Sequence, residues 1–262
     1  MENDIKKPKF LNLFNPKSCS FECSLHGRIA GYYLEHNNER NYICPLCEEE
    51  KQIKEQEERA RREAEILKIR RESVYKNMNI EPEYREKELE DFIPQTPEQE
   101  QALEAVKQMI AEKSGKIILL GSNGVGKTFL GCMAVKALGG KILSMYEITT
   151  MIRQCYSPRA TQTELEFVEN LASMPMLVID EIGRTKGSEA EMNWLSYILD
   201  KRHTRNLPFM ILTNTHLSRF CRKKGCDSCF ERFVNNDVLS RLKQNSQIIS
   251  IHAPDYRQGV KK

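Results

Sequence analysis

The 262-residue sequence has no apolar run approaching the roughly 18 residues that a membrane-spanning helix needs. Its first ten residues, MENDIKKPKF, lack the apolar centre of a secretory signal peptide. An excess of one charge is also missing, because 40 Lys and Arg against 37 Asp and Glu leave a net charge of only +3. Any DNA or RNA site must therefore be a local basic patch. These absences favour a cytoplasmic protein without a membrane partner.

Cysteine, in contrast, is plentiful, with nine residues. Thiols stay reduced in the cytosol, so clustered cysteines there indicate metal ligands before disulfides. The first cluster offers five candidates for the four positions around one Zn²⁺: Cys19, Cys23, His26, Cys44 and Cys47. The tight knuckle CPLC at 44–47 pairs best with Cys23 and His26, which predicts a small zinc ribbon. The alternative set uses Cys19 in place of His26.

A second cluster follows the spacing H-x4-C-x4-C-x2-C, with His216, Cys221, Cys226 and Cys229. This spacing fits either a second zinc site or a set of reduced thiols. The two remaining cysteines are expected to pack as small apolar side chains in a core. They are Cys132 and Cys155.

Charge is concentrated in residues 48–72, which hold 17 charged side chains in 25 positions. Acids precede bases by four residues in pairs such as Glu55/Arg59 and Glu58/Arg62, a spacing that stabilises an isolated helix. The pattern predicts a solvated spacer helix. We therefore divide the chain into a zinc-binding module (1–50), a charged helical linker (51–77) and a larger domain (78–262).

The larger domain alternates helical and strand-like segments. A capping signal at Thr96 opens a helix with apolar residues at helical spacing. Short apolar runs then recur, separated by helical stretches, at 116–120, 141–145, 176–180, 208–214 and 246–251. Strands spaced by helices predict an α/β fold with a mostly parallel sheet.

A phosphate-binding loop lies at the end of the first of these runs. The pattern G-x-x-x-x-G-K-[ST] needs glycines so that backbone N–H groups can surround phosphates, while the lysine contacts the β- and γ-phosphates and the hydroxyl binds Mg²⁺. It follows a strand and precedes a helix, as such a loop must. Its residues are Gly121, Ser122, Asn123, Gly124, Val125, Gly126, Lys127 and Thr128.

Acidic and amide side chains follow two further buried runs. Asp180 and Glu181 end the strand at 176–180, and Asn214 ends the strand at 208–214. The carboxyl ends of parallel strands meet at one edge of a sheet, where ligands bind. We expect Asp180 to hold Mg²⁺, Glu181 to activate the attacking water, and Asn214 to orient that water or contact the γ-phosphate.

Together, GSNGVGKT, MLVIDEIG and ILTNT resemble the AAA+ ATPases of the DnaC/DnaI-like helicase-loader and IstB-like group, over about residues 78–260. The segment MNIEPEYREKELEDF resembles the stretch that precedes the core in these loaders. The resemblance implies a P-loop core with a five-stranded parallel sheet of order 5-1-4-3-2 and no helical lid.

The resemblance also implies a site shared between protomers. Leu239-Ser240-Arg241-Leu242 is similar to the arginine-finger segment, so Arg241 would reach the ATP of a neighbouring protomer, with Arg232 as a competing candidate. Asp255-Tyr256-Arg257 is similar to the segment carrying the sensor-two arginine. An ATP-dependent homo-oligomer follows, with ATP and Mg²⁺ as cofactors.

The order of zinc module, charged helix and ATPase core resembles phage and prophage loader-like proteins. It implies an ATPase that loads a replicative, DnaB-type helicase onto single-stranded DNA. The alternative within the group is an IstB-like regulator of a transposase. A non-hydrolysing DNA-binding adaptor and a kinase-type P-loop enzyme fit the residues less well.

Two local features bear on DNA. Arg153, Tyr156 and Arg159 lie in the region that faces single-stranded DNA in the resembling loaders, and a basic groove with an aromatic ring suits stacking. The densest basic patch of the core fits either phosphate binding or an ordinary solvated helix face. It consists of Arg219, Arg222, Lys223 and Lys224.

Overall fold

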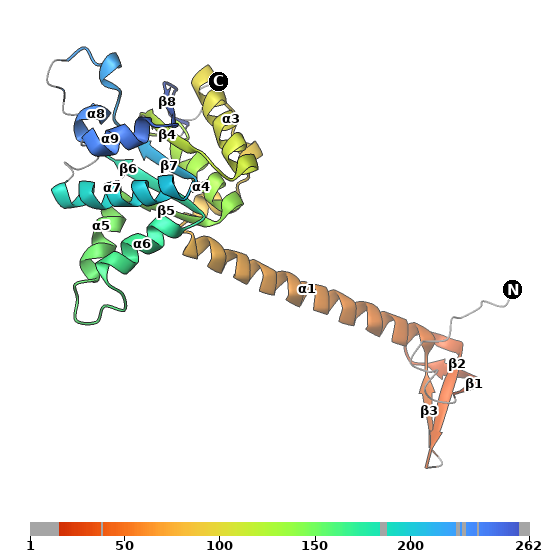
Figure 1. Ribbon diagram of the computed structural model, residues 1–262. Coiled ribbons are helices and arrows are strands. Elements are labelled where there is room, and N and C mark those ends of the chain that lie inside the picture. Colours follow the sequence, from red (N-terminus) through yellow and green to blue (C-terminus); the bar gives the residue numbers. More distant parts are fainter. Residues whose placement is uncertain are drawn as a thin grey trace. The chain divides into compact units, whose positions relative to one another are not determined.

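The computed structural model (Figure 1) describes residues 16–37, 39–183, 188–223, 226, 229–234 and 236–256. The chain divides into two units, Met1–Arg71 and Glu72–Lys262. The boundary falls within the long helix α1, which spans Pro45–Asn77. Each unit is built on its own sheet.

The first unit contains a three-stranded antiparallel sheet in the order β1-β2-β3. The strands are β1 (Lys17–Cys23), β2 (Gly27–His36) and β3 (Glu39–Ile43). Among its described residues, the apolar side chains that are buried are those of Cys23, Cys44 and Pro45. So little buried apolar surface cannot offset the entropy of ordering the chain. This unit needs another source of stability.

Helix α1 is 33 residues long and begins at Pro45, so that Cys47 lies in its first turn. Every residue from Lys51 to Val74 is exposed. Such a helix is stabilised by its own side-chain pairs, of which Glu58 and Arg62 form one at 3.5 Å.

The second unit contains a five-stranded, wholly parallel sheet in the order β5-β6-β7-β4-β8. Its strands are β4 (Lys116–Gly121), β5 (Gly140–Ser144), β6 (Met176–Ile182), β7 (Phe209–Thr213) and β8 (Gln247–Ile251). Numbered from one to five along the chain, the order is 2-3-4-1-5, which is the predicted 5-1-4-3-2 from the opposite edge. The predicted α/β core and its strand order are confirmed.

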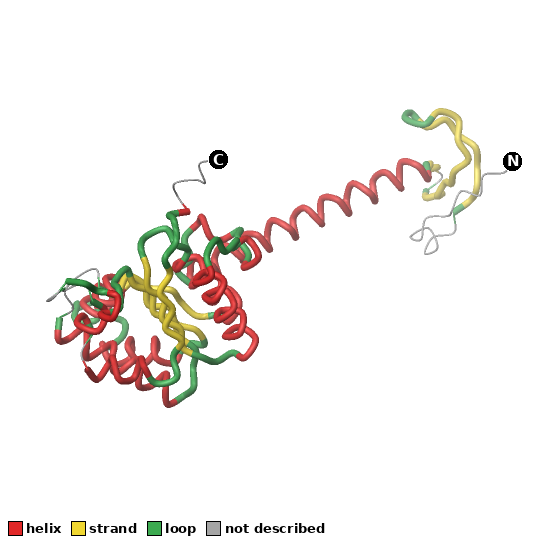
Figure 2. Tube along the Cα trace, turned by 90° about the horizontal axis from the view of Figure 1, so that it is seen from above, coloured by secondary structure: helices red, strands yellow, loops and turns green. Residues whose placement is uncertain are grey.

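Helices cover both faces of this sheet (Figure 2). Alternate residues of one strand serve the two cores: Ile118 and Leu120 of β4 pack with α5, α6, α7 and α9, while Ile117 and Leu119 pack with α3 and α4. The helices are α3 (Pro97–Glu112), α4 (Lys127–Leu138), α5 (Met145–Gln154), α6 (Glu164–Ser173), α7 (Glu189–Thr204), α8 (Phe230–Phe233) and α9 (Asn236–Lys243). The short helices α2 (Pro82–Arg85), η2 (Leu89–Asp91) and η3 (Ser218–Phe220) lie in the connections.

Local sequence explains where the main helices begin. The Thr96 hydroxyl accepts a hydrogen bond from the Gln99 amide and Pro97 follows it, as predicted for the start of α3. Reciprocal capping boxes, in which an acid three residues on bonds back to the cap, start α5, α6 and α7. The caps are Ser144, Thr163 and Ser188.

Candidate functional site

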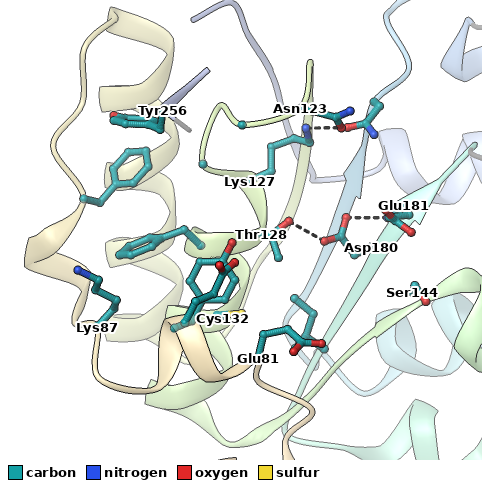
Figure 3. Close-up of a pocket in the computed structure, with 18 of the residues that line it drawn as sticks. Glu81, Lys87, Asn123, Lys127, Thr128, Cys132, Ser144, Asp180, Glu181 and Tyr256 are labelled. Atoms are coloured by element: carbon teal, nitrogen blue, oxygen red, sulfur yellow. Dashed lines mark hydrogen bonds between the residues drawn. The ribbon is translucent and has the colours of Figure 1, made fainter. Parts of the chain in front are cut away.

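The carboxyl ends of β4, β6 and β7 open into a cavity of about 1170 Å³ in the second unit (Figure 3). It is lined by both acids, by Asn214 and by five residues of the predicted phosphate-binding loop: Asn123, Gly124, Gly126, Lys127 and Thr128. Parallel strands direct their carboxyl ends to one edge, which is why residues far apart in sequence meet here.

The loop between β4 and α4 adopts a backbone that requires glycine at two points. Gly124 and Gly126 have positive φ angles of 76° and 95°. A Cβ on Gly124 would lie 1.7 Å from an Asp255 carboxylate oxygen, and one on Gly126 would lie 2.4 Å from the Phe92 ring. The glycines therefore permit both the curl of the loop and the close approach of its neighbours.

Lys127, at the start of α4, is 6% exposed. Its ammonium donates hydrogen bonds to the carbonyls of Gly121 (2.8 Å) and Ser122 (2.7 Å) and to Asn214 Oδ1 (2.9 Å). The last contact joins the start of α4 to the residue that follows β7. The structure thus brings the lysine and Asn214 together in the cavity.

Asp180 lies opposite, near the end of β6 (Figure 3). Its Oδ2 accepts a hydrogen bond from the Thr128 hydroxyl at 2.8 Å, and its Oδ1 accepts one from the Glu181 amide at 2.6 Å. Burial raises the pKa of Asp180 above its ordinary value, and the hydrogen bonds oppose that rise. A hydroxyl and a partly buried carboxylate in contact match the oxygen ligands that Mg²⁺ prefers.

A bulge in β6 explains how two consecutive acids line one cavity. In a regular strand their side chains would point to opposite faces. Here the register with β7 shifts between Ile179 and Ile182, and Glu181 takes a positive φ of 56°. Bulges redirect side chains in this way and recur beside active sites. The sequence pattern alone does not reveal the bulge.

The far side of the cavity is made by residues whose role the motifs did not predict. Tyr84, Phe92 and Phe129 form a chain of ring contacts, with centroids 5.6–6.1 Å apart, and Phe92 also contacts Tyr256 at 6.0 Å. The Tyr256 amide donates to the Gly124 carbonyl at 3.0 Å. The segment 79–93 thereby lines the cavity beside the phosphate-binding loop with a mixed surface: the rings of Tyr84 and Phe92 lie among charged side chains such as Glu81 and Lys87. The resemblance of this segment to the stretch before the loader core was its only sequence signal.

Several predicted residues lie apart from this cavity or outside the described part of the chain. Arg257 and Lys224 lie outside the described part of the chain. The side chains of Arg232 and Arg241 also lie outside that part, although the backbone of Arg241 belongs to α9. Arg153, Tyr156 and Arg159 are exposed at the end of α5 and in the loop that follows. Tyr156 donates to Glu164.

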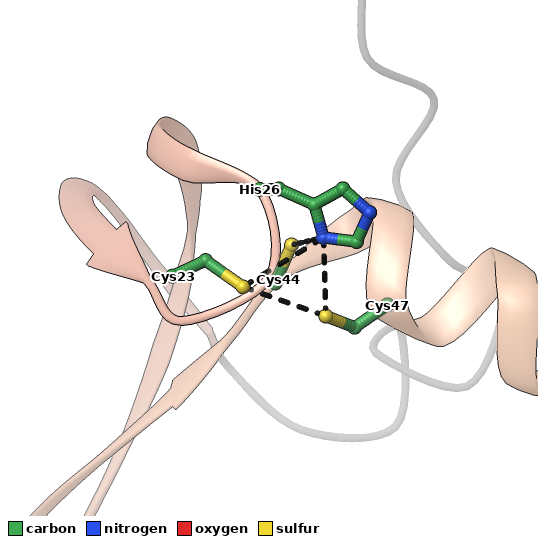
Figure 4. Close-up of side chains that lie close together, drawn as sticks. All are labelled: Cys23, His26, Cys44 and Cys47. Atoms are coloured by element: carbon green, nitrogen blue, oxygen red, sulfur yellow. Dashed lines mark hydrogen bonds between the residues drawn. The ribbon is translucent and has the colours of Figure 1, made fainter.

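The first unit gathers a separate cluster at the turn after β1 and the start of α1 (Figure 4). The ligand-type atoms of Cys23, His26, Cys44 and Cys47 lie within 4.8 Å of one another. The three sulfurs lie 3.3–3.7 Å from His26 Nδ1. A sulfur and a nitrogen bound to the same tetrahedral zinc would be about 3.5–3.6 Å apart, given Zn–S near 2.3 Å and Zn–N of about 2.0–2.1 Å. Cys19 lies outside this group.

Two details of this cluster suit a metal. His26 Nε2 lies 3.3 Å from Glu50 Oε1, a carboxylate placed to orient the ring while Nδ1 faces the sulfurs. The Leu25 amide and the His26 side chain lower the pKa of the Cys23 thiol to about 6, while the hydrogen bond to Cys23 and burial raise the pKa of the Cys47 thiol to about 12, so without an ion the thiolate forms on Cys23 first.

The other cysteines separate into two groups. His216, Cys221, Cys226 and Cys229 form a second cluster, also with ligand atoms within 4.8 Å of one another. Cys132 is 1% exposed in one core, and Cys155 packs against the other, as predicted. Burial raises the pKa of Cys132 to about 12, so this thiol stays neutral.

The family model for the IstB-like ATP binding protein matches residues 51–262. The chain belongs to the IstB-like ATP-binding protein family. This confirms the resemblance read from GSNGVGKT, MLVIDEIG and ILTNT. The match begins after the cysteine cluster of the first unit, which the family model does not include.

Curated relatives of this IstB-like protein include the replicative helicase loader DnaC of Escherichia coli K12. It is 26% identical over 208 residues, which are 76% of this chain and 80% of the relative. The loader DnaC of Shigella flexneri gives the same values.

Solved structures confirm the fold of the second unit. The crystal structure of the DnaC helicase loader superposes with a TM-score of 0.53 at 22% identity, covering 66% of this chain and all of that one. DnaI gives a TM-score of 0.51 at 19% identity, covering 67% and 93%. The replication initiator DnaA bound to AMPPCP and single-stranded DNA gives 0.53 at 21%, covering 66% and 51%. None of the helices in the described part of the chain is long and apolar enough to span a membrane.

Proposed function

We propose that this IstB-like protein is an ATPase that loads a replicative, DnaB-type helicase onto single-stranded DNA. One observation carries the proposal: a complete set of phosphate-contacting and acidic side chains meets in one cavity of a chain that is related to the DnaC loaders. A non-hydrolysing adaptor would not need two acids on the cavity, one of them aimed there by a strained backbone.

Each residue of the cavity has a role in this proposal. The amides of Gly121–Thr128 would surround the phosphates, with Lys127 on the β- and γ-phosphates. Thr128 and Asp180 would hold Mg²⁺, which neutralises charge on the transferred phosphoryl group. Glu181 would accept a proton from the attacking water, and Asn214 would orient that water.

The remaining roles rest on the family resemblance. Arg241 would reach the nucleotide of a neighbouring protomer and stabilise charge developing in the transition state, which makes hydrolysis depend on assembly. Arg257 would contact nucleotide bound to its own protomer. Arg153, Tyr156 and Arg159, which are all exposed, would contact single-stranded DNA by charge and stacking.

The first unit would serve as a zinc-dependent docking module. We assign Cys23, His26, Cys44 and Cys47 as the ligands of a structural Zn²⁺, because their ligand-type atoms lie within 4.8 Å of one another. The chain would then consist of this module (1–50), a charged linker within α1 (51–77) and the ATPase domain (78–262). This layout supports a phage or prophage protein whose zinc module contacts the helicase.

A capture experiment tests the client and the cavity together. The Glu181→Gln variant should bind ATP but lose turnover by about 10²–10⁴-fold, the usual effect of removing a general base. With ATP it should retain the host replicative helicase on beads more strongly than wild type, whereas Lys127→Ala should retain little with or without ATP. Glu189→Gln, an exposed acid at the start of α7, is the matched control.

One rival within the same group is an IstB-like regulator of a transposase, and the match to the IstB-like family model is compatible with it. ATP-dependent capture of the transposase instead of the helicase would support that reading. Unchanged ATP hydrolysis in Glu181→Gln would contradict the proposed catalytic role of this residue.

A further inference from the structure

The connection between β7 and α8, residues 214–229, begins at the nucleotide cavity. Its first residues, Asn214 and Thr215, line that cavity. In its described part the regular structure is the three-residue helix η3 and a single bridge between His216 and Cys229. Such a segment gains little from secondary structure, yet it leads to α8 and α9.

Four side chains of this segment meet at one point. The ligand-type atoms of His216, Cys221, Cys226 and Cys229 lie within 4.8 Å of one another. His216 Nε2 lies 3.6 Å from the sulfur of Cys226 and 3.5 Å from that of Cys229. A nitrogen and a sulfur bound to the same tetrahedral zinc would be about 3.6 Å apart.

The backbone fixes the first and last of the four side by side. The Phe230 amide donates to the His216 carbonyl at 2.8 Å, which extends the parallel bridge between His216 and Cys229. The Ser218 amide donates to Glu231 Oε2 at 2.8 Å. Phe230 and Leu217 are buried in the core between these contacts. Two of the four candidate ligands are therefore held together by contacts independent of any metal.

The charges of this segment complement those of a closed zinc site. Three thiolates and a neutral imidazole around Zn²⁺ carry a net charge of −1. Arg219, Arg222 and Lys223 lie on the same segment and would offset that charge, whereas without an ion burial raises the pKa of the Cys229 thiol to about 11. This gives the basic residues a purpose besides phosphate binding.

We propose that His216, Cys221, Cys226 and Cys229 bind a structural Zn²⁺ in the ATPase unit, separate from the zinc of the first unit. Four protein ligands close the coordination shell, so this site is structural rather than catalytic. The ion clamps the connection that runs from Asn214, which contacts Lys127, to the helices that follow. The bound ion stabilises the folded loop, as burial of a larger apolar core would.

Metal counting on the full-length protein tests the proposal. The double variant Cys44→Ser/Cys47→Ser removes the candidate ligands of the first unit and should retain one zinc per chain. Adding Cys226→Ser should reduce this to none. Adding Cys155→Ser instead should leave one, because Cys155 donates to the Met151 carbonyl and belongs to neither cluster. Adding Cys226→His, which restores a ligand, should also leave one.

Absence of zinc from the double variant would overturn the proposal, and so would a zinc that survives Cys226→Ser. A second measurement does not depend on the folding of any variant. Wild-type protein stripped of metal should bind two equivalents of Co²⁺ with thiolate charge-transfer absorption. A single equivalent, or a disulfide among residues 221–229 in protein kept under reductant, would contradict the second site.

Discussion

At the scale of single residues, Asp180 shows how the cavity is prepared for a cation. Its carboxylate is partly buried, accepts hydrogen bonds from Thr128 and the Glu181 amide, and has its pKa raised by desolvation. A raised pKa means that the charged form costs stability in the folded protein at neutral pH. A bound divalent cation would remove that cost.

Replacing Asp180 by Asn should therefore stabilise the nucleotide-free protein, by about 0.5–2 kcal/mol, the range of single stabilising substitutions. The amide keeps an acceptor for the Glu181 N–H and can donate to the Thr128 oxygen. The gain should be largest above the raised pKa and should shrink as the pH falls through it, because Asp180 is then protonated in the wild type. Thermal unfolding from pH 4 to 8 measures this.

The same variant should lose the stabilisation that wild type gains from Mg²⁺ and ATP. Glu90→Gln, an exposed acid on η2, serves as the control and should change neither quantity. An Asp180→Asn protein that is less stable than wild type at every pH would contradict the conclusion that burial governs this carboxylate.

At the scale of elements, Arg202 connects three segments. It lies on α7, is fully buried, and its guanidinium donates to the carbonyls of Leu171 (3.1 Å), Met174 (2.8 Å) and Pro175 (3.3 Å). It also donates to the carbonyl of Pro208, just before β7. Burial lowers its pKa to about 10, so it stays charged at neutral pH. It thus satisfies carbonyls at the end of α6 and at the starts of β6 and β7.

Replacing Arg202 by Met should lower the free energy of unfolding by about 3–5 kcal/mol, because several buried carbonyls lose their donor. Urea unfolding measures the loss. Arg205→Met is the matched control, since Arg205 forms a partly exposed ion pair with Glu169 and should cost less than about 1 kcal/mol. A loss of similar size in both variants would contradict the role assigned to Arg202.

The elements also show what the sequence predicts well. The start of α3 at Thr96 and the strand before the phosphate-binding loop are both determined by neighbouring residues. Local sequence patterns therefore locate them. The left-handed Glu181 and the buried Arg202 depend on strands and carbonyls far away in sequence. No local pattern marks them. From the sequence alone, Arg202 would be placed on the surface, because the last turn of its helix is basic. The ring contacts of Tyr84 and Phe92 with Phe129 also join distant parts of the sequence, and no motif predicted them.

At the scale of the whole molecule, the two units are stabilised in different ways. The second unit has two apolar cores on the faces of its sheet. The first unit has a three-stranded sheet around the candidate zinc ligands and little else that is buried. In modules of this kind, the free energy of zinc binding drives folding.

We therefore expect Cys47→Ser to abolish hydrogen-exchange protection across β1–β3 while β4, β6 and β7 stay protected. Cys19→Ser should leave both units protected, because Cys19 lies outside the cluster. Exchange followed by mass spectrometry resolves the two units within one sample. Loss of protection in β1–β3 on replacing Cys19 would restore the alternative ligand set, in which Cys19 takes the place of His26.

The closure of the phosphate-binding loop from both sides has a consequence for synthesis. Gly126 packs against Phe92, whereas Gly124 packs against Asp255 and Tyr256. A ribosome makes the first partner before the loop and the second long after it, and β8, which pairs with β4, also comes late. In the nascent chain, the phosphate-binding loop therefore lacks its later contacts until most of the unit has been synthesised. Nucleotide should therefore bind with full affinity only to a chain that is complete through Tyr256.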